Sequence, residues 1–193
     1  MINTAKKYLG INEQGKAQLM EYYNKNAYPL IEPNRKYKIK LNDQWCAMFC
    51  SVIAHKNGLK VNQFPYEVSV FYMTQKAQKM GLKYVKYADM RVNDLVIYDW
   101  KDDGTLNHVG IIQEIGKDYI KVLEGNYSDT VKVRTLKYPN REIECFIRVP
   151  EIVDIELLAR EVIQGKYGTG ETRKKILGDN YAEVQKRVTE ILK

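Results

Sequence analysis

The stretch DQWCAMFCSVIAHKNG (residues 43–58) and the strands that follow it decide the fold. Its apolar residues predict a helix over residues 45–56, with Asp43 as the expected N-cap and Asn57-Gly58 as a typical helix end. Further along the chain the pattern changes to alternating or continuous apolar runs separated by turn residues. These runs are LVIYDW (95–100), HVGIIQEI (108–115), YIKVLEG (119–125), VKVRTL (131–136) and ECFIRVP (144–150). Helices followed by a meander of antiparallel strands predict an α+β fold, with the helices packed on one side of a sheet.

The sequence predicts two regions, one before and one after Pro150. The first 80 residues have helical patterns, including a helix over residues 68–79, and Pro150 closes the last predicted strand. Beyond it the apolar residues return to the i, i+3, i+4, i+7 spacing of amphipathic helices, interrupted by glycines. The sequence therefore predicts a main domain over residues 1–150 and a small three-helix bundle over residues 151–193.

Composition and charge exclude several classes of protein. With 45% hydrophobic and 28% charged residues, the chain is typical of a folded protein rather than a disordered or fibrous one. The N-terminus lacks the apolar run of a signal peptide, and no stretch is long enough for a membrane span, so we expect synthesis in the host cytoplasm. The net charge of +7 lies in residues 1–150, because residues 151–193 hold equal numbers of acidic and basic side chains. This charge suits polyanionic cell walls, and we expect no nucleic-acid partner because the sequence has no nucleic-acid-binding motif.

Three cysteines in a chain without a secretion signal favour free thiols over a disulfide framework. If Asp43 is the N-cap, Cys46 is the third residue of the helix, where unpaired N–H groups and the positive end of the dipole favour a thiolate. Cys50 lies one turn further among apolar residues, and Cys145 lies in a predicted strand, so both are expected to be inert core thiols. The CxxxC spacing matches neither a zinc site nor a redox motif, and no cofactor is expected.

A thiolate nucleophile needs a histidine to exchange its proton, and the chain has two. His55 follows Cys46 by nine residues, which turns it to the opposite side of the predicted helix, so it cannot reach the thiol. His108 opens a predicted strand and is by exclusion the candidate base. If the next strand returns beside it through a hairpin, Glu124 and Asn126 come near His108, and either one could orient the imidazole.

The segments WCAMFCSVIAHKNG, NDLVIYDW, NHVGIIQEI and LEGN resemble the CHAP family of papain-like cysteine amidohydrolases and peptidases, which cleave peptidoglycan. The resemblance covers about residues 1–150. It implies a papain-like fold in which Cys46, His108 and Glu124 form the catalytic set. The acidic cluster with which some members bind calcium is missing ahead of the cysteine, so we expect no required metal.

The residues around the nucleophile depart from the family pattern at one position. The family often has Gln directly before the nucleophile, whereas here Trp45 occupies that position and Gln44 precedes it. We expect Gln44, Trp45 and Asn126 to contact the substrate.

The segments IELLAREVIQGKYGTGETRKKIL and YAEVQKRVTEIL resemble a wall-binding repeat found in some phage lysozymes. The resemblance implies binding to the disaccharide-peptide unit of the wall, and we expect Tyr167, Arg173 and Gln185 to provide contacts. A helical bundle that only caps the main domain is the alternative. The repeat usually occurs in tandem, so a single copy implies weak binding unless the chain forms a homo-oligomer.

These features predict a peptidoglycan hydrolase, a phage endolysin that lyses Gram-positive walls. It is expected to act as an N-acetylmuramoyl-L-alanine amidase or as an endopeptidase, and the sequence leaves open which amide of the stem peptide or cross-bridge is cut. Release to the wall is expected to pass through a holin pore. A non-catalytic wall-binding protein and a zinc or redox protein are the alternatives.

Overall fold

The computed structural model describes residues 1–82, 84–151 and 153–193. The chain divides into two compact units, Met1–Pro150 and Glu151–Lys193, and each is described by itself.

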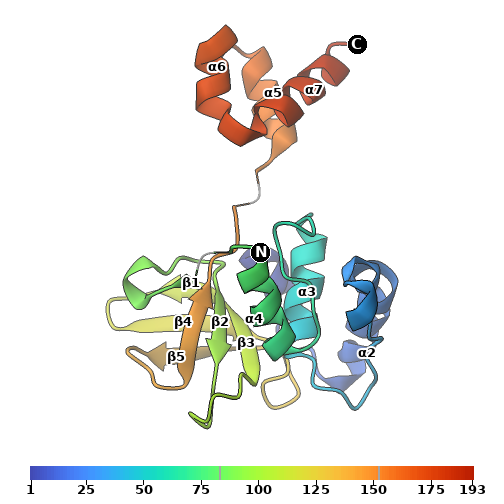
Figure 1. Ribbon diagram of the computed structural model, residues 1–193, viewed down its shortest axis with the longest axis vertical. Coiled ribbons are helices and arrows are strands. Elements are labelled where there is room, and N and C mark those ends of the chain that lie inside the picture. Colours follow the sequence, from blue (N-terminus) through green and yellow to red (C-terminus); the bar gives the residue numbers. More distant parts are fainter. Residues whose placement is uncertain (83, 152) are drawn as a thin grey trace. The chain divides into compact units, whose positions relative to one another are not determined.

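Helices come first in the first unit and flank its sheet (Figure 1). The longer helices are α2 (Glu13–Tyr22), α3 (Cys46–Lys56) and α4 (Val70–Lys79). Short helical segments are α1 (Ile2–Ala5), η1 (Lys6–Tyr8), η2 (Tyr23–Ala27), η3 (Tyr28–Leu30), η4 (Pro33–Arg35) and η5 (Tyr87–Asp89). Helix α3 ends as the sequence predicts, because Asn57 is its C-cap and Gly58 takes the left-handed backbone with φ of 75°.

Within the described residues, six strands form one antiparallel sheet in the order β1-β6-β2-β3-β4-β5. Their bounds are β1 (Tyr84–Val85), β2 (Leu95–Tyr98), β3 (His108–Ile115), β4 (Tyr119–Glu124), β5 (Lys132–Lys137) and β6 (Ile143–Ile147). The predicted α+β class is therefore confirmed. The predicted meander holds for β2 to β5 only, since β6 returns to pair with β2 and β1 adds to its outer edge. Periodicity identifies a strand but not its partner, and β1 is too short to produce a pattern.

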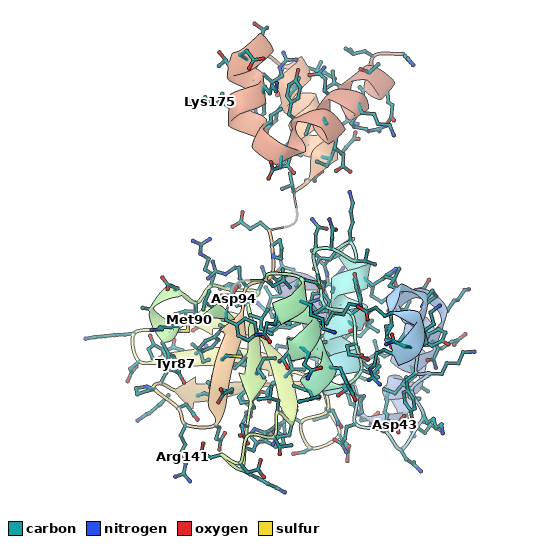
Figure 2. All side chains as sticks on the ribbon, in the orientation of Figure 1. Asp43, Tyr87, Met90, Asp94, Arg141 and Lys175 are labelled. Carbon is teal, nitrogen blue, oxygen red and sulfur yellow. The ribbon has the colours of Figure 1, made fainter. Side chains whose placement is uncertain are left out.

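Both faces of the sheet are covered, which explains why the strands are continuously apolar. Leu95 and Ile97 of β2 pack in the large core that contains α3. Val96, which points the other way, packs in a second core together with Met90. Figure 2 labels Met90 and Tyr87 on the side of the sheet away from α3. Strand β2 is completely buried as a result.

The N-terminus of α3 differs from the prediction. The helix begins at Cys46, its N-cap is Trp45, and no side chain caps it. The Asp43 carboxylate, labelled in Figure 2, instead accepts hydrogen bonds from the Lys40 backbone N–H at 2.7 Å and the Tyr37 hydroxyl at 3.0 Å. Asp43 as N-cap is therefore wrong, because its carboxylate stabilises the preceding turn, and Cys46 is the first rather than the third residue of the helix.

The second unit consists of α5 (Ile155–Ile163), α6 (Gly170–Leu177), η6 (Gly178–Asn180) and α7 (Tyr181–Ile191). Helix α5 is capped by Asp154, whose carboxylate accepts a hydrogen bond from the Leu157 backbone N–H at 2.9 Å. The three helices share one small core made of Ala159, Val162, Leu177, Val184 and Val188. No helix in the described part of the chain is long and apolar enough to cross a membrane.

Candidate active site

The Cys46 thiol lies at the N-terminal end of α3 and is almost completely buried. The first backbone N–H groups of a helix have no partner within the helix, and the dipole is positive at this end, so a negative charge is stabilised here. Trp45 fixes the start of the helix, because it is 0% exposed and its ring packs edge-on against Phe49 with centroids 6.4 Å apart. The buried ring therefore has a structural role, and the substrate contact by Trp45 stays a prediction.

His108 is the first residue of β3 and lies opposite Tyr98 of β2. The ring is 2% exposed, and its Nε2 lies 3.2 Å from Oε2 of Glu124. The ring also hydrogen-bonds Cys46. Since Nε2 faces Glu124, the other nitrogen, Nδ1, is left to exchange a proton with the thiol.

The surroundings of His108 favour its charged form. Burial lowers the pKa of His108, but hydrogen bonds to Cys46 and Glu124, together with their negative charges, outweigh burial and raise the pKa to about 9. A protonated imidazole between a thiol and a carboxylate is the state from which a proton can be given to a leaving group.

Glu124 ends β4 and is completely buried. Oε1 accepts a hydrogen bond from the Tyr98 hydroxyl, and Oε2 accepts one from Nε of Arg134 at 2.9 Å in addition to that from His108. Burial raises the pKa of Glu124, but the hydrogen bond and charge of His108 and the charge of Arg134 lower it below its usual value. Glu124 is therefore an ionised carboxylate at neutral pH, held by three donors.

Tyr98 and Arg134 are parts of this site that the sequence analysis missed. Tyr98 pairs with His108 across β2 and β3, and Arg134 pairs with Val122, two residues before Glu124 on β4. Paired and alternate residues share one face of a sheet, so all of these polar groups gather on one side. The only sequence signal was an arginine inside an apolar strand pattern, and it indicates a partner only once the strand register is known.

Gly110 makes room for the Glu124 side chain. It pairs with Glu124 across β3 and β4, and a Cβ at residue 110 would lie 2.7 Å from Cγ of Glu124 and 2.5 Å from Cγ1 of Val122. Both distances are shorter than van der Waals contact allows. A glycine is therefore required here for the carboxylate to lie against His108.

We expect Gly110→Ala to lower activity at least about tenfold and to cost about 1–3 kcal/mol in the free energy of unfolding, because overpacking pushes the Glu124 side chain away from His108. Urea denaturation and wall lysis measure the two effects. Gly15→Ala is the matched control, since its Cβ would meet only the Ile11 side chain and alanine favours the helix that it lies in. Unchanged activity in Gly110→Ala would show that Glu124 does not need its observed position.

Comparison with known families gives two matches. Residues 37–126 match the family model of the CHAP domain, and residues 156–192 match that of the CW_7 repeat. The chain carries a CHAP domain and a CW_7 repeat. A CHAP domain indicates a peptidoglycan amidase or peptidase, and a CW_7 repeat indicates binding to the cell wall, so the resemblances found in the sequence are confirmed. No curated protein matches the chain.

Glu124 and Asn126, the two candidates for orienting His108, contact different groups. Nδ2 of Asn126 donates a hydrogen bond to Oε1 of Gln44 at 2.6 Å, whereas Glu124 contacts the imidazole. Asn126 has a positive φ of 62° and connects the end of β4 to the segment before Cys46. Because this bond occupies the carbonyl of the exposed Gln44 side chain, its NH₂ group is left to donate elsewhere.

The remaining thiols and the second histidine of the chain have different surroundings from Cys46 and His108. Cys50 is completely buried, and burial raises its pKa well above the usual value. Cys145 was expected in the core but is only half-buried; burial and then the charge of Glu144 raise its pKa to about 12. Both of these thiols are therefore protonated at neutral pH. Nδ1 of His55 lies 2.8 Å from the Tyr22 hydroxyl.

The predicted contacts of the CW_7 repeat form two separate hydrogen-bonded groups. Arg173 donates to the Gly168 carbonyl through Nε at 3.0 Å and Nη2 at 2.7 Å, and Nη1 donates to Oε1 of Gln185 at 3.2 Å. The Tyr167 hydroxyl donates to Glu161 at 2.6 Å. Arg173 and Gln185 therefore lie together beside the glycine-rich turn, while the hydroxyl of Tyr167 faces α5.

Metal ligands do not gather in the described residues: no group of three His, Cys, Asp or Glu side chains there could hold a metal ion.

Proposed function

We propose that the CHAP domain is a cysteine-dependent peptidoglycan hydrolase in which Cys46 is the nucleophile, His108 the acid and base, and Glu124 the group that orients the imidazole. The proposal is supported by one observation above all: the hydrogen-bonded chain from Cys46 through His108 to a buried carboxylate. This order of groups is what thiol-dependent acyl transfer requires.

The proposed reaction is acyl transfer from an amide of the peptidoglycan peptide. The Cys46 thiolate attacks the amide carbonyl, and the resulting oxyanion is stabilised by the Cys46 backbone N–H and by the free NH₂ group of Gln44. His108 then protonates the leaving amine, which releases it and leaves a thioester on Cys46. A water molecule, deprotonated by His108, hydrolyses the thioester and releases the Cys46 thiolate, while the protonated His108 is restored.

The CW_7 repeat is proposed to hold the enzyme at the wall through Arg173, Gln185 and the ring of Tyr167, the last with its hydroxyl fixed by Glu161. One copy gives monovalent binding, which homo-oligomerisation would strengthen. A phage endolysin that reaches Gram-positive walls through a holin pore fits both parts of the chain, and this finer assignment rests on the family resemblance.

The test is turbidity clearing of Gram-positive walls by the full chain, with and without prior alkylation by iodoacetamide. We expect clearing that alkylation abolishes, because the thiolate is both the nucleophile and the alkylated group. Alkylated protein should still sediment with walls through the CW_7 repeat. Clearing that survives alkylation at Cys46 would disprove the cysteine mechanism, and sedimentation without any clearing would favour a non-catalytic wall-binding protein.

A further inference from the structure

An exposed tryptophan covers the catalytic histidine. The Trp100 ring stacks on His108 with centroids 4.6 Å apart and an angle of 27° between the planes. His108 is almost completely buried, but Trp100 is 42% exposed, whereas Trp45 is completely buried. An exposed aromatic ring that lies directly on a buried histidine is placed where a ligand of that site can contact it.

The ring is held in place by the loop that carries it. The Asp99 carboxylate accepts hydrogen bonds from the backbone N–H groups of Lys101 at 3.2 Å and Gly104 at 2.6 Å, which closes the loop after β2. The edge of the Tyr127 ring approaches Trp100 with centroids 6.1 Å apart. A ligand that stacks on Trp100 therefore meets a surface that needs little further ordering, which lowers the entropic cost of binding.

The chemistry of an aromatic face selects among the parts of peptidoglycan. The face of an indole is electronegative and attracts the weakly positive C–H groups of a pyranose ring. The side chains of a stem peptide contain no ring and offer no comparable flat surface. A cation flanks the neighbouring ring, since Nζ of Lys132 lies 4.5 Å from the centroid of Tyr127. This ammonium suits a carboxylate of the stem peptide, so sugar and peptide have separate places beside His108.

We propose that Trp100 is the platform for the sugar that precedes the scissile bond, which makes the glycan-peptide junction the amide that Cys46 attacks. A muramic acid stacked on Trp100 carries its stem peptide on a short lactyl ether, and the first amide of that peptide then lies beside His108 and Cys46. The inference deepens the proposed function and rests on it: it names an amidase rather than an endopeptidase.

Tryptophan fluorescence tests this inference without turnover. The full-length Cys46→Ala variant is titrated with the disaccharide of N-acetylglucosamine and N-acetylmuramic acid, with the disaccharide-tripeptide, and with the sugar-free tripeptide. Residues 151–193 contain no tryptophan, so binding to the CW_7 repeat does not contribute directly to the emission. We expect both sugar-bearing ligands to change the emission saturably and the tripeptide to need at least about tenfold higher concentration. Trp100→Leu in the same background should abolish the change.

Steady-state kinetics distinguish a role of Trp100 in binding the sugar from a role in covering His108. Trp100→Leu should raise KM for the disaccharide-tripeptide at least about tenfold and leave kcat within a few-fold, whereas the loss of a cover for His108 would lower kcat. Phe71→Leu is the matched control, because Phe71 is 47% exposed and lies on α4. A lowered kcat with an unchanged KM, or an emission change that the tripeptide produces as well as the disaccharide, overturns the inference. Sugar binding by a protein that clears no walls would instead refute the proposed hydrolysis alone.

Discussion

Replacing Cys46 with serine is expected to reduce wall lysis at least about 100-fold while the protein stays folded. The hydroxyl of serine is far less acidic than a thiol, so neither the helix N-terminus nor His108 can convert it to the anion that attacks an amide. Initial rates of turbidity clearing measure the loss, and circular dichroism checks the fold.

The other two cysteines provide controls for the same experiment. Cys50→Ala and Cys145→Ala should keep activity within a few-fold, because burial raises the pKa of both thiols and keeps them protonated. Cys50→Ala removes a completely buried sulfur, so some loss of stability is expected. An inactive but folded Cys50→Ala protein together with an active Cys46→Ser protein would mean that the nucleophile had been misassigned.

Helix periodicity and a small inventory of reactive residues made much of the site predictable. The chain has two histidines, and the nine-residue step from Cys46 to His55 excludes one of them, so His108 follows without knowledge of the sheet. The strand HVGIIQEI is observed with the bounds that its pattern predicts. Glu124 and Asn126 could not be ranked, however, because a hairpin brings both residues near His108 and only side-chain geometry shows which one faces the ring.

The interactions that the sequence did not reveal depend on competition between local partners and on strand register. Asp43 is a good capping residue, but its carboxylate has closer donors in the turn at Lys40, which a sequence pattern does not rank. Arg134 contacts Glu124 only because β5 pairs with β4 in one particular register. A shift by one residue would turn Arg134 to the opposite face of the sheet.

The second large effect on activity is expected from replacing Glu124. Glu124→Gln is expected to lower kcat at least about 100-fold, because a neutral amide no longer stabilises the charged His108 ring or fixes its tautomer. The same change leaves the largely buried Arg134 with only the longer contact to the exposed carboxylate of Glu142 at 3.7 Å. Removing one partner of a buried ion pair costs about 3–5 kcal/mol in the free energy of unfolding. Urea denaturation and wall lysis measure the two losses independently.

A second substitution separates the structural role of Glu124 from its role in the reaction. Arg134→Met replaces the cation with an apolar chain of similar length, so the double variant Glu124→Gln, Arg134→Met no longer buries a charge that has lost its main partner and should recover most of the lost stability. It should not recover activity, because His108 still lacks its carboxylate. If the double variant lyses walls as well as the unmodified protein, Glu124 serves only to neutralise Arg134, and the imidazole must be oriented by another group, for which Asn126 is the nearest candidate on the same strand end. If stability recovers while lysis stays at least about 100-fold low, the carboxylate acts on the histidine itself.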